Sequence, residues 1–261
     1  MNSMLFDRQR LVHLRDLLLE LVARDMKIRY KRSVLGLSWS LITPLLQLLV
    51  FYLLFQAILA LPVRRFTSFT LIGLLVWGWF QSSLNQGATA ITGNRELIRR
   101  PGFPSAILPV VTVTTNFVHF LLALPILLIV LLIDGSNVGL TILTLPFVMI
   151  LQFALTLSLA FLVAGTNVIF ADMQHILVVV LMLLFFMTPI FYDPSTLPEQ
   201  FQPLYRLNPL ALLLEAYRAV LMEGVQPDWL PLMAVCIVAA LLLYAGYRFF
   251  THVSYRFVEE L

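Results

Sequence analysis

Long apolar stretches, each nearly free of charged residues, alternate with shorter polar segments along this chain. A helix needs about 20 apolar residues to cross roughly 30 Å of hydrocarbon. Six stretches approach or exceed that length, and we expect each of them to form a membrane-spanning helix. They are residues 35–61, 69–91, 105–133, 138–167, 175–192 and 230–250. The pattern therefore predicts an all-α integral membrane protein with six transmembrane helices.

The segment before the first stretch, residues 5–32, has the periodicity of an amphipathic helix. Its apolar residues recur every three or four positions, whereas charged residues occupy the other faces. The apolar residues are Leu11, Leu14, Leu18, Val22 and Met26. Such a helix lies in the membrane interface rather than crossing the bilayer. We expect it to act either as a passive anchor or as a surface that meets substrate headgroups or a cytoplasmic partner.

The polar segment between the second and third stretches, residues 92–109, predicts one short helical turn. Its sequence is TGNRELIRRPGFPSAILP, in which Asn94 is placed to cap a helix and the later prolines are placed to end it. Leu97 and Ile98 are expected to be exposed among three arginines. This arrangement fits either a solvated turn or docking into a groove on a soluble protein.

The segment before the last stretch, residues 193–229, predicts short helices on the outer side. Asn208 is expected to cap a helix in which Pro209 occupies the first turn. One apolar stripe then follows at helical spacing, formed by Leu210, Leu213, Leu214, Tyr217 and Leu221. At about 14 residues, this helix is too short to cross a bilayer. It fits either a lid over a pathway or a buried connector.

Composition and charge indicate the class of protein and its orientation. The 261 residues are 60% hydrophobic and only 12% charged, with a mean hydropathy of +0.92, whereas soluble domains are about 25% charged. Thirteen of the 17 Lys and Arg residues lie before the first stretch, between the second and third stretches, or at and beyond the end of the last, where Arg248 and Arg256 stand. Because cytoplasmic loops are enriched in Lys and Arg, we expect both termini on the cytoplasmic side. The net charge of +3 is explained by this topology and by anionic lipids, and it does not indicate nucleic acid binding.

Several kinds of chemistry lack their sequence signatures. A P-loop needs a lysine after a glycine-rich turn, whereas the only lysines, Lys27 and Lys31, lie in the basic N-terminal segment with no glycine before them. We therefore expect no ATP hydrolysis by this chain alone. The single cysteine, Cys236, allows no intrachain disulfide or cysteine-based metal site, and the HExxH and GxSxG patterns are absent. No catalytic residue, metal site or cofactor is expected in this chain.

The apolar stretches also lack charged residues near their centres, whereas membrane ion pathways usually contain them. The energy for any transport is therefore expected to come from elsewhere. Aromatic residues are frequent in or near the stretches. They fit either interfacial belts or the lining of a path on which sugar faces stack. The residues considered for such a path are Tyr52, Trp77, Phe185, Phe186 and Tyr192.

Five segments together resemble the permease subunits of type-two ABC exporters. They are RDMKIRYKRSVLGLSWSLITPLLQLLVFYLLF (24–55), LIRRPGFPSAILP (97–109), NVIFADMQHIL (167–177), TPIFY (188–192) and LNPL (207–210). The branch that the chain resembles most moves lipid-linked polysaccharides, namely O antigen, capsule and teichoic acid. The resemblance covers nearly the whole chain, with the segments in the right order.

This resemblance implies a complex of two permease copies and two cytoplasmic ABC ATPase subunits in the bacterial cytoplasmic membrane. The ATPases bind ATP and Mg²⁺, and a lipid-linked polysaccharide passes between the permeases. The resemblance also implies that residues 5–32 form an interface helix, that residues 193–229 form an outer gate, and that residues 94–100 form a coupling helix. The coupling residues that contact the ATPase are then Asn94, Arg95, Glu96, Leu97, Ile98, Arg99 and Arg100.

The remaining site residues belong to the two ends of the expected path. Arg29, Lys31 and Arg32 are expected to attract the phosphate of the substrate headgroup, because arginine binds phosphate through paired, charge-assisted hydrogen bonds. The outer gate residues are Asn208, Pro209 and Tyr217. Three alternatives stay open, which are a related permease for a drug or an ordinary lipid, a membrane-embedded transferase, and a channel.

Overall fold

The computed structural model describes residues 2–31, 36–60, 63–170, 172–196 and 198–257, and all regular elements in these ranges are helical. The principal helices are α1 (Asn2–Tyr30), α2 (Trp39–Phe51), α3 (Phe66–Ala88), α4 (Arg95–Ile98), α5 (Ile107–Ile133), α6 (Leu145–Ile169), α7 (Met173–Met187), α8 (Gln202–Arg206), α9 (Pro209–Arg218) and α10 (Trp229–Val253). Two of them continue as π-helix, α2 through Tyr52–Ile58 and α9 through Ala219–Glu223. Short 3-10 turns occupy Gly36–Ser38, Thr92–Asn94, Leu140–Thr144, Pro194–Thr196, Glu199–Phe201 and Ser254–Arg256.

Four helical segments are long and apolar enough to cross a membrane. They are Leu41–Ile58, Ile107–Ile133, Leu140–Ile169 and Trp229–Arg256. The all-α membrane class predicted from the sequence is therefore confirmed, while the count of six spans stays a prediction. The two remaining expected spans correspond to α3, which is 23 residues long, and α7, which is 15 residues long.

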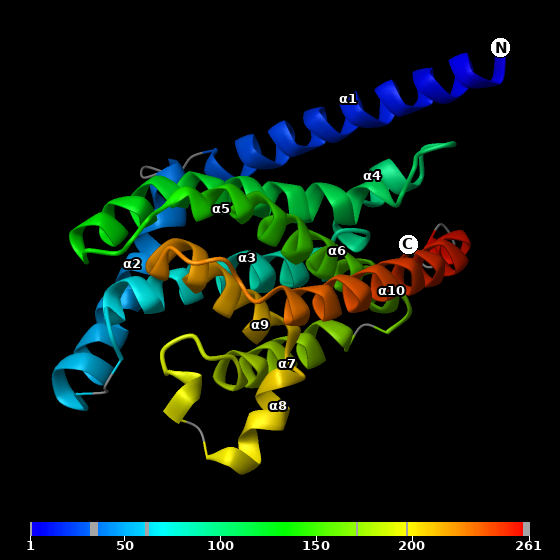
Figure 1. Cartoon of the computed structure of the whole chain (residues 1–261). Coiled ribbons are helices and arrows are strands. Elements are labelled where there is room, and N and C mark those ends of the chain that lie inside the picture. The colour runs from blue at the N-terminus through cyan, green and yellow to red at the C-terminus, as the bar shows by residue number, and fades with distance from the viewer. Residues whose placement is uncertain (1, 32–35, 61–62, 171, 197, 258–261) are drawn as a thin grey trace.

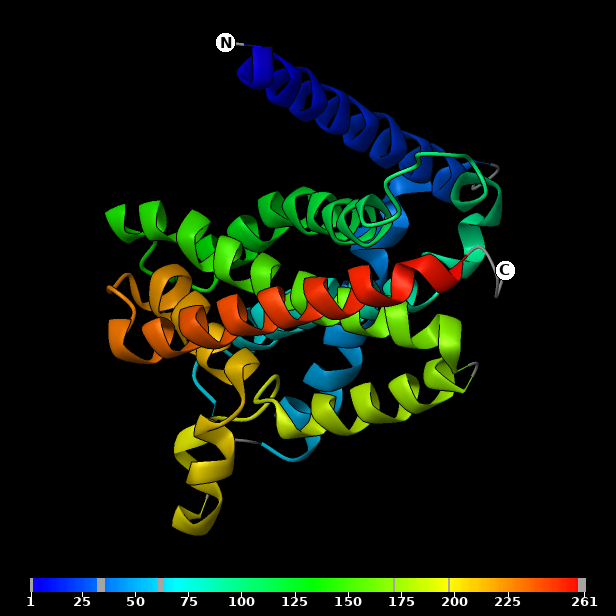
Figure 2. The same cartoon turned by 90° about the vertical axis from the view of Figure 1, so that its right-hand side faces the viewer.

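Helix α3 lies inside the bundle and contacts α2, α5, α6, α7 and α9. Most of its residues are buried, including Ser68, Thr70 and Ser83. Neighbouring helices rather than lipid surround these polar side chains, which explains why α3 is less apolar than the four segments that qualify as spans. Helices α6 and α10 run side by side in both views (Figures 1 and 2). Gly246 permits this approach, because an added Cβ would lie 2.6 Å from the Ser158 carbonyl oxygen.

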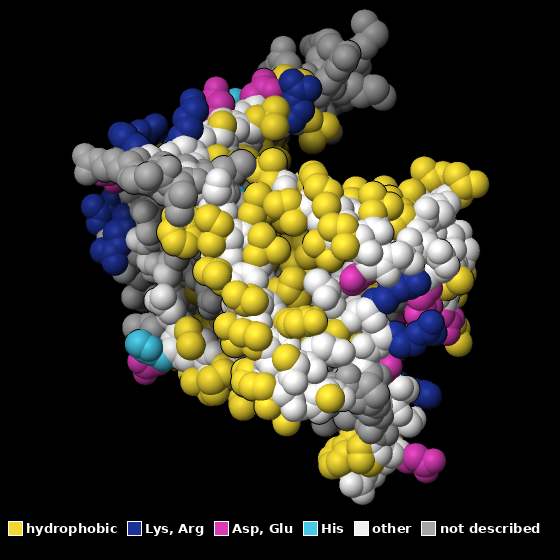
Figure 3. All heavy atoms as spheres, turned by 90° about the vertical axis from the view of Figure 1, so that its left-hand side faces the viewer, with side chains coloured by type: hydrophobic (Ala, Val, Ile, Leu, Met, Phe, Trp, Pro, Cys, Tyr) yellow, Lys and Arg dark blue, Asp and Glu magenta, His cyan; other side chains and the backbone are white. Residues whose placement is uncertain are grey.

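The surface of the bundle is broadly apolar, as expected for contact with lipid. Figure 3 shows hydrophobic side chains across the middle of one face, with charged side chains gathered toward its edges. Exposed apolar residues are frequent on α2, α7 and α10. Cys236 is among the exposed residues of α10. The interior core is built mainly from buried residues of α3, α5, α6 and α9, with fewer from α2, α7 and α10.

Helix α1 runs along one side of the bundle, with its N-terminal end projecting away from the other helices (Figures 1 and 2). It begins at Asn2, three residues before the predicted start. Leu14, Leu18 and Val22, from the predicted apolar stripe, pack with Leu21 against a small core. That core includes Ile98 of α4 and residues of α5, α6 and α10. The apolar face of α1 therefore connects the N-terminal helix to the predicted coupling segment.

Candidate functional site

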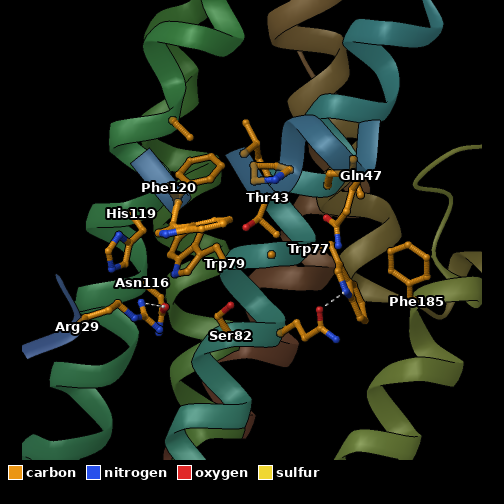
Figure 4. Close-up of a pocket in the computed structure, with 17 residues that line it drawn as sticks. Arg29, Thr43, Gln47, Trp77, Trp79, Ser82, Asn116, His119, Phe120 and Phe185 are labelled. Carbon is orange, nitrogen blue, oxygen red and sulfur yellow. Dashed lines mark hydrogen bonds between the residues drawn. The ribbon is translucent and has the colours of Figure 1, made fainter. Parts of the chain in front are cut away.

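A cavity of about 410 Å³ opens between α1, α2, α3, α5 and α7. Its volume falls within the roughly 300–1,000 Å³ range of small-molecule binding sites. Figure 4 shows that Arg29 and Asn116 lie at one side of this cavity and that Trp77 and Phe185 lie at the other. Thr43, Trp79 and Ser82 lie between these two sides, and His119 and Phe120 lie on the side of Asn116. The lining therefore combines hydrogen-bonding groups with ring faces.

The polar side of the cavity is organised around Asn116. The Asn116 Nδ2 donates to the Thr112 carbonyl at 2.9 Å and to Gln86 Oε1 at 3.1 Å, which fixes the amide orientation. Asn116 Oδ1 accepts a hydrogen bond of 3.3 Å from Arg29 Nη1. Asn116 is buried whereas Arg29 is exposed. The guanidinium therefore reaches the cavity from its open side and is held there by one long hydrogen bond to Asn116.

A series of ring contacts leads from the other side of the cavity to the turn after α7. Trp77 meets Phe185 at a centroid distance of 5.6 Å, Phe185 meets Phe191 at 6.1 Å, and Phe191 meets Tyr192 at 5.5 Å. We call these four residues the aromatic ladder. Trp77 Nε1 donates to Gln81 Oε1 at 3.0 Å, so the polar atom of this ring is satisfied within α3. The ladder thus extends the aromatic wall of the cavity toward turn 188–192.

Only some of the predicted path residues belong to the aromatic ladder. Trp77, Phe185 and Tyr192 belong to the ladder, and Phe186 contacts Phe185 edge-on at 5.4 Å although its side chain is 60% exposed. Tyr52 lies apart from the ladder, where it meets Phe66 at 6.5 Å. Sequence reasoning did not identify Phe191, a ring of the ladder that also contacts α2. The signal was its place in the TPIFY segment, next to Tyr192, which had been considered.

The predicted headgroup residues are also separated. Arg29 alone lines the cavity, whereas Lys31 lines a surface hollow together with Arg24 and Lys27. Arg32 lies outside the described residues. Asn116 could not be singled out from the sequence, because its role depends on the approach of α1 to α5, which are 87 residues apart at this contact.

The predicted coupling segment forms the short helix α4, with a different role for Asn94 than expected. The side chain of Asn94 makes no cap hydrogen bond, so the predicted cap is wrong. Instead, Asn94 Nδ2 donates to the Ala90 carbonyl at 2.9 Å, and Asn94 Oδ1 accepts from Arg24 Nη2 at 3.0 Å. A contact from α1 therefore takes the oxygen that a cap would have used.

The apolar and the charged side chains of this segment differ in their exposure to solvent. Ile98 is buried and Leu97 is half-buried against the small core that includes α1, contrary to the expectation that both are exposed. The residues that face solvent are Arg95, Glu96, Arg99 and Arg100. The accessible surface of the coupling segment is therefore charged rather than apolar.

The predicted start of the outer gate helix is confirmed. Asn208 Oδ1 accepts a hydrogen bond of 3.0 Å from the Leu210 backbone nitrogen, and Pro209 is the first residue of α9. Asn208 Nδ2 also donates to Thr188 Oγ1 at 3.0 Å, which links the start of α9 to turn 188–192. Tyr217 is fully buried and meets Phe120 of the cavity edge-on at 6.1 Å.

Arg218, at the end of α9, is the residue that sequence reasoning placed least well. It was counted among the basic residues of the outer loops, but its side chain is only 5% exposed. Its guanidinium carbon lies 3.3 Å from the centroid of the Phe69 ring. Burial lowers the pKa of Arg218 to about 9, so the side chain remains cationic at neutral pH. The signal in the sequence was its spacing of four residues from Leu214, which places it on the apolar stripe of α9.

A second cavity, of about 590 Å³, lies beside the predicted gate helices. Its lining includes Tyr205, Glu215 and Arg218. Tyr205 Oη donates to Glu215 Oε1, and burial together with this bond raises the pKa of Tyr205. Among the residues that the structure describes, no group of three or more His, Cys, Asp or Glu is placed to hold a metal ion.

Comparisons with known proteins were made for the whole chain. The family model for ABC-2 type transporters matches residues 16–222. The O-antigen export system permease protein RfbA of Myxococcus xanthus is 36% identical over 249 residues, which cover 95% of this chain and 96% of that protein. A protein of the same name from Klebsiella pneumoniae is 30% identical over 250 residues, with coverage of 95% and 96%. The polysialic acid transport protein KpsM of Escherichia coli is 25% identical over 233 residues, with coverage of 87% and 89%.

Proposed function

This chain belongs to the ABC-2 type transporter family, and from that membership we propose that it is the transmembrane subunit of an exporter that moves lipid-linked polysaccharide across the bacterial cytoplasmic membrane. The relatives named for O-antigen export and polysialic acid transport support a glycan as the substrate class. The apolar helices and the apolar surface agree with a multi-pass location in that membrane.

One observation carries the proposal at the level of chemistry, namely a cavity that combines an arginine with a series of aromatic rings. Arg29 supplies a cation suited to a phosphate group of the lipid carrier. Trp77 and Phe185 supply ring faces on which sugar rings can pack through apolar contact. Neutral hydrogen-bonding groups such as Ser82 and Gln81 complete the lining. A phosphate-linked sugar requires these three kinds of contact together.

We propose that six helices cross the membrane, with both termini in the cytoplasm and residues 193–229 at the outer side. Two copies of this chain then assemble with two ATPase subunits, which bind ATP and Mg²⁺. The charged surface of residues 94–100 is the site at which each ATPase docks. Movement of this segment reaches α1 through the hydrogen bond between Arg24 and Asn94 and through the shared apolar core.

The first experiment tests the headgroup role of the basic residues. Replacement of Arg29, Lys31 and Arg32 by alanine is expected to reduce surface glycan strongly while the amount of protein in the membrane stays normal. Arg15→Ala is the matched control, because Arg15 lies on the same helix and pairs with Asp16 at the surface. Normal export by the triple variant would remove the headgroup role. A deletion strain that keeps its surface glycan but becomes sensitive to drugs would instead support the alternative of a drug exporter.

The second experiment tests the coupling segment. Glu96→Ala combined with Arg100→Ala changes exposed side chains only, so the fold of the permease should be retained. In the reconstituted complex, we expect the permease to lose its stimulation of ATP hydrolysis by the partner subunit. Leu97→Ala and Ile98→Ala should lower stimulation through the packing of α4 instead. Unchanged stimulation in all of these variants would refute the assignment of residues 94–100.

A further inference from the structure

The chain between α7 and α8 turns back into the helix bundle at residues 188–192. Thr188, Pro189 and Ile190 are buried. Ile190 lies directly against α3 at Gly73, where an added Cβ would lie 2.9 Å from the Ile190 carbonyl oxygen. A side chain at position 73 would therefore push the turn away from α3. The turn is seated on the central helix by close backbone contact.

Arg218 also ties this turn to α3. Its Nη2 donates to the carbonyl oxygens of Pro189 at 2.7 Å, Ile190 at 3.1 Å and Phe69 at 3.2 Å. Two of these acceptors belong to the turn and the third belongs to the first turn of α3. The guanidinium also lies flat enough over the Phe69 ring to bring its carbon within 3.3 Å of the centroid. One buried side chain thus joins α9, α3 and the turn.

The other end of α9 holds the same turn through Asn208. Its Nδ2 donates to Thr188 Oγ1, and Thr188 Oγ1 donates in turn to the Leu184 carbonyl at 2.7 Å. Helix α9 therefore contacts turn 188–192 through its N-cap residue and its last residue. Because both contacts are hydrogen bonds from buried or half-buried side chains, water competes with them poorly. The position of the turn depends on α9.

The turn carries Phe191, which has ring contacts on two other helices. Phe191 stacks on Phe55 with a centroid distance of 4.7 Å and an interplanar angle of 10°. It also contacts Phe51 at 5.5 Å and Phe185 at 6.1 Å. A shift of the turn would therefore move the ring that joins the aromatic ladder to α2.

We propose that Arg218 is a positioning residue of the export path, because it holds turn 188–192 and thereby sets where Phe191 stands in the aromatic ladder. Arg218 acts through the turn rather than on the glycan. The importance of this role for transport rests on the proposed export function, whereas the position of the turn is a property of this chain that can be measured without a substrate.

Because the chain has a single cysteine, the accessibility of the turn can be tested by cysteine labelling. Cys236→Ala gives a cysteine-free parent, into which Ile190→Cys is introduced as a reporter of the turn. Leu155→Cys, at a buried position of α6, reports on the rest of the bundle. Each reporter is combined with Arg218→Gln or with the control Arg206→Gln, which changes an exposed arginine of α8. The rate of maleimide labelling is measured on the assembled complex, and export and ATP hydrolysis are measured in parallel.

Arg218→Gln is expected to raise the labelling rate of the Ile190→Cys reporter at least tenfold, while the Leu155→Cys reporter stays protected. Export should fall while ATP hydrolysis continues, and Arg206→Gln should leave both labelling and export unchanged. If Arg218→Gln prevents assembly, Arg218→Lys takes its place, because it keeps the charge but not the flat guanidinium.

Three results would overturn the proposal. In the first, the Ile190→Cys reporter stays protected in the Arg218 variant. In the second, both reporters become labelled, which would show that Arg218 stabilises the whole bundle. In the third, the turn becomes accessible while export is unchanged. A parent protein that exports no glycan would contradict the proposed function instead, and the labelling result would still stand.

Discussion

Two arginines frame the aromatic ladder, Arg29 across the cavity from Trp77 and Arg218 against the turn that carries Phe191, and their surroundings differ. Arg29 reaches the cavity from the exposed end of α1 and makes one hydrogen bond of 3.3 Å, to a side-chain oxygen. Arg218 is buried at the end of α9, and one of its nitrogens donates to three backbone carbonyls. The same chemical group is therefore accessible at one end and enclosed by backbone at the other.

This difference indicates that Arg29 is placed to bind a ligand, whereas Arg218 is placed to stabilise the fold. A guanidinium has five N–H donors, and Arg29 uses one of them within the part of the chain that the structure describes. Its remaining donors can meet an incoming phosphate. Arg218 is only 5% exposed and its Nη2 is occupied by three carbonyl oxygens, so its removal would take a charged donor from buried backbone. Stability and transport measurements on matched variants can separate these two roles.

The largest effect is expected from Arg218→Gln. Three buried carbonyls lose a charged donor, and each such loss costs about 1–3 kcal/mol before relaxation. We expect the free energy of unfolding to fall by about 3 kcal/mol, measured as the thermal inactivation of the detergent-solubilised complex. Arg206→Gln provides the control for loss of a positive charge in the same region. Equal melting temperatures for Arg218→Gln and Arg206→Gln would contradict the stabilising role assigned to Arg218.

The next effect concerns two glycines of α3. Gly73→Ala places a methyl group against the Ile190 carbonyl, and such overpacking typically costs 1–3 kcal/mol. Gly78→Ala is the matched control, because an added Cβ there meets nothing within 4 Å and Gly78 lines the cavity. Since alanine favours a helix over glycine, that variant should be as stable as the wild type or slightly more stable. The same melting measurement compares the stability of the two variants. A Gly73→Ala variant as stable as the wild type would contradict the close contact between the turn and Gly73.

A smaller loss is expected from Asn208→Ala. This change removes the cap of α9 and the bond to Thr188, and loss of a cap costs about 1 kcal/mol. Because Asn208 and Arg218 hold the same turn, the double variant should lose less stability than the sum of the single variants. Additive losses would show that the two residues act independently.

The smallest effect on stability is expected from Arg29→Gln. An exposed side chain with one long hydrogen bond contributes little, so the free energy of unfolding should change by no more than about 0.5 kcal/mol. Export should nevertheless fall, since the cavity loses its cation. A large loss of stability with normal export would reverse the roles assigned to the two arginines.

The parts of the structure that depend on local sequence were predicted well. Long apolar runs indicated the helices, because a bilayer leaves few other ways to satisfy the backbone. The start of α9 followed from Asn208 and Pro209, since a cap involves only neighbouring residues. The cap predicted at Asn94 failed because Arg24, 70 residues away, takes the side-chain oxygen.

The site itself depends on contacts that sequence spacing does not reveal. Asn116 and Gln86 come from different helices, and they meet only when α3 packs on α5. The burial of Arg218, which had only been counted with the basic residues of the outer side, was missed because its acceptors are backbone carbonyls at Phe69, Pro189 and Ile190, which carry no side-chain signature. Trp77 and Phe185 were identified by residue type, whereas their contact became visible only in the structure.

The π-helical end of α2 has a mechanical consequence for the ring that stacks on Phe191. A π-helical hydrogen bond joins residues five apart rather than four, so Tyr52–Ile58 holds more residues per turn than the helix before it. Conversion of this segment to α-helix would rotate Phe55 about the helix axis while the preceding part of α2 kept its place. The π-helical turn therefore sets the direction in which the Phe55 side chain points, and with it the stack of Phe55 on Phe191.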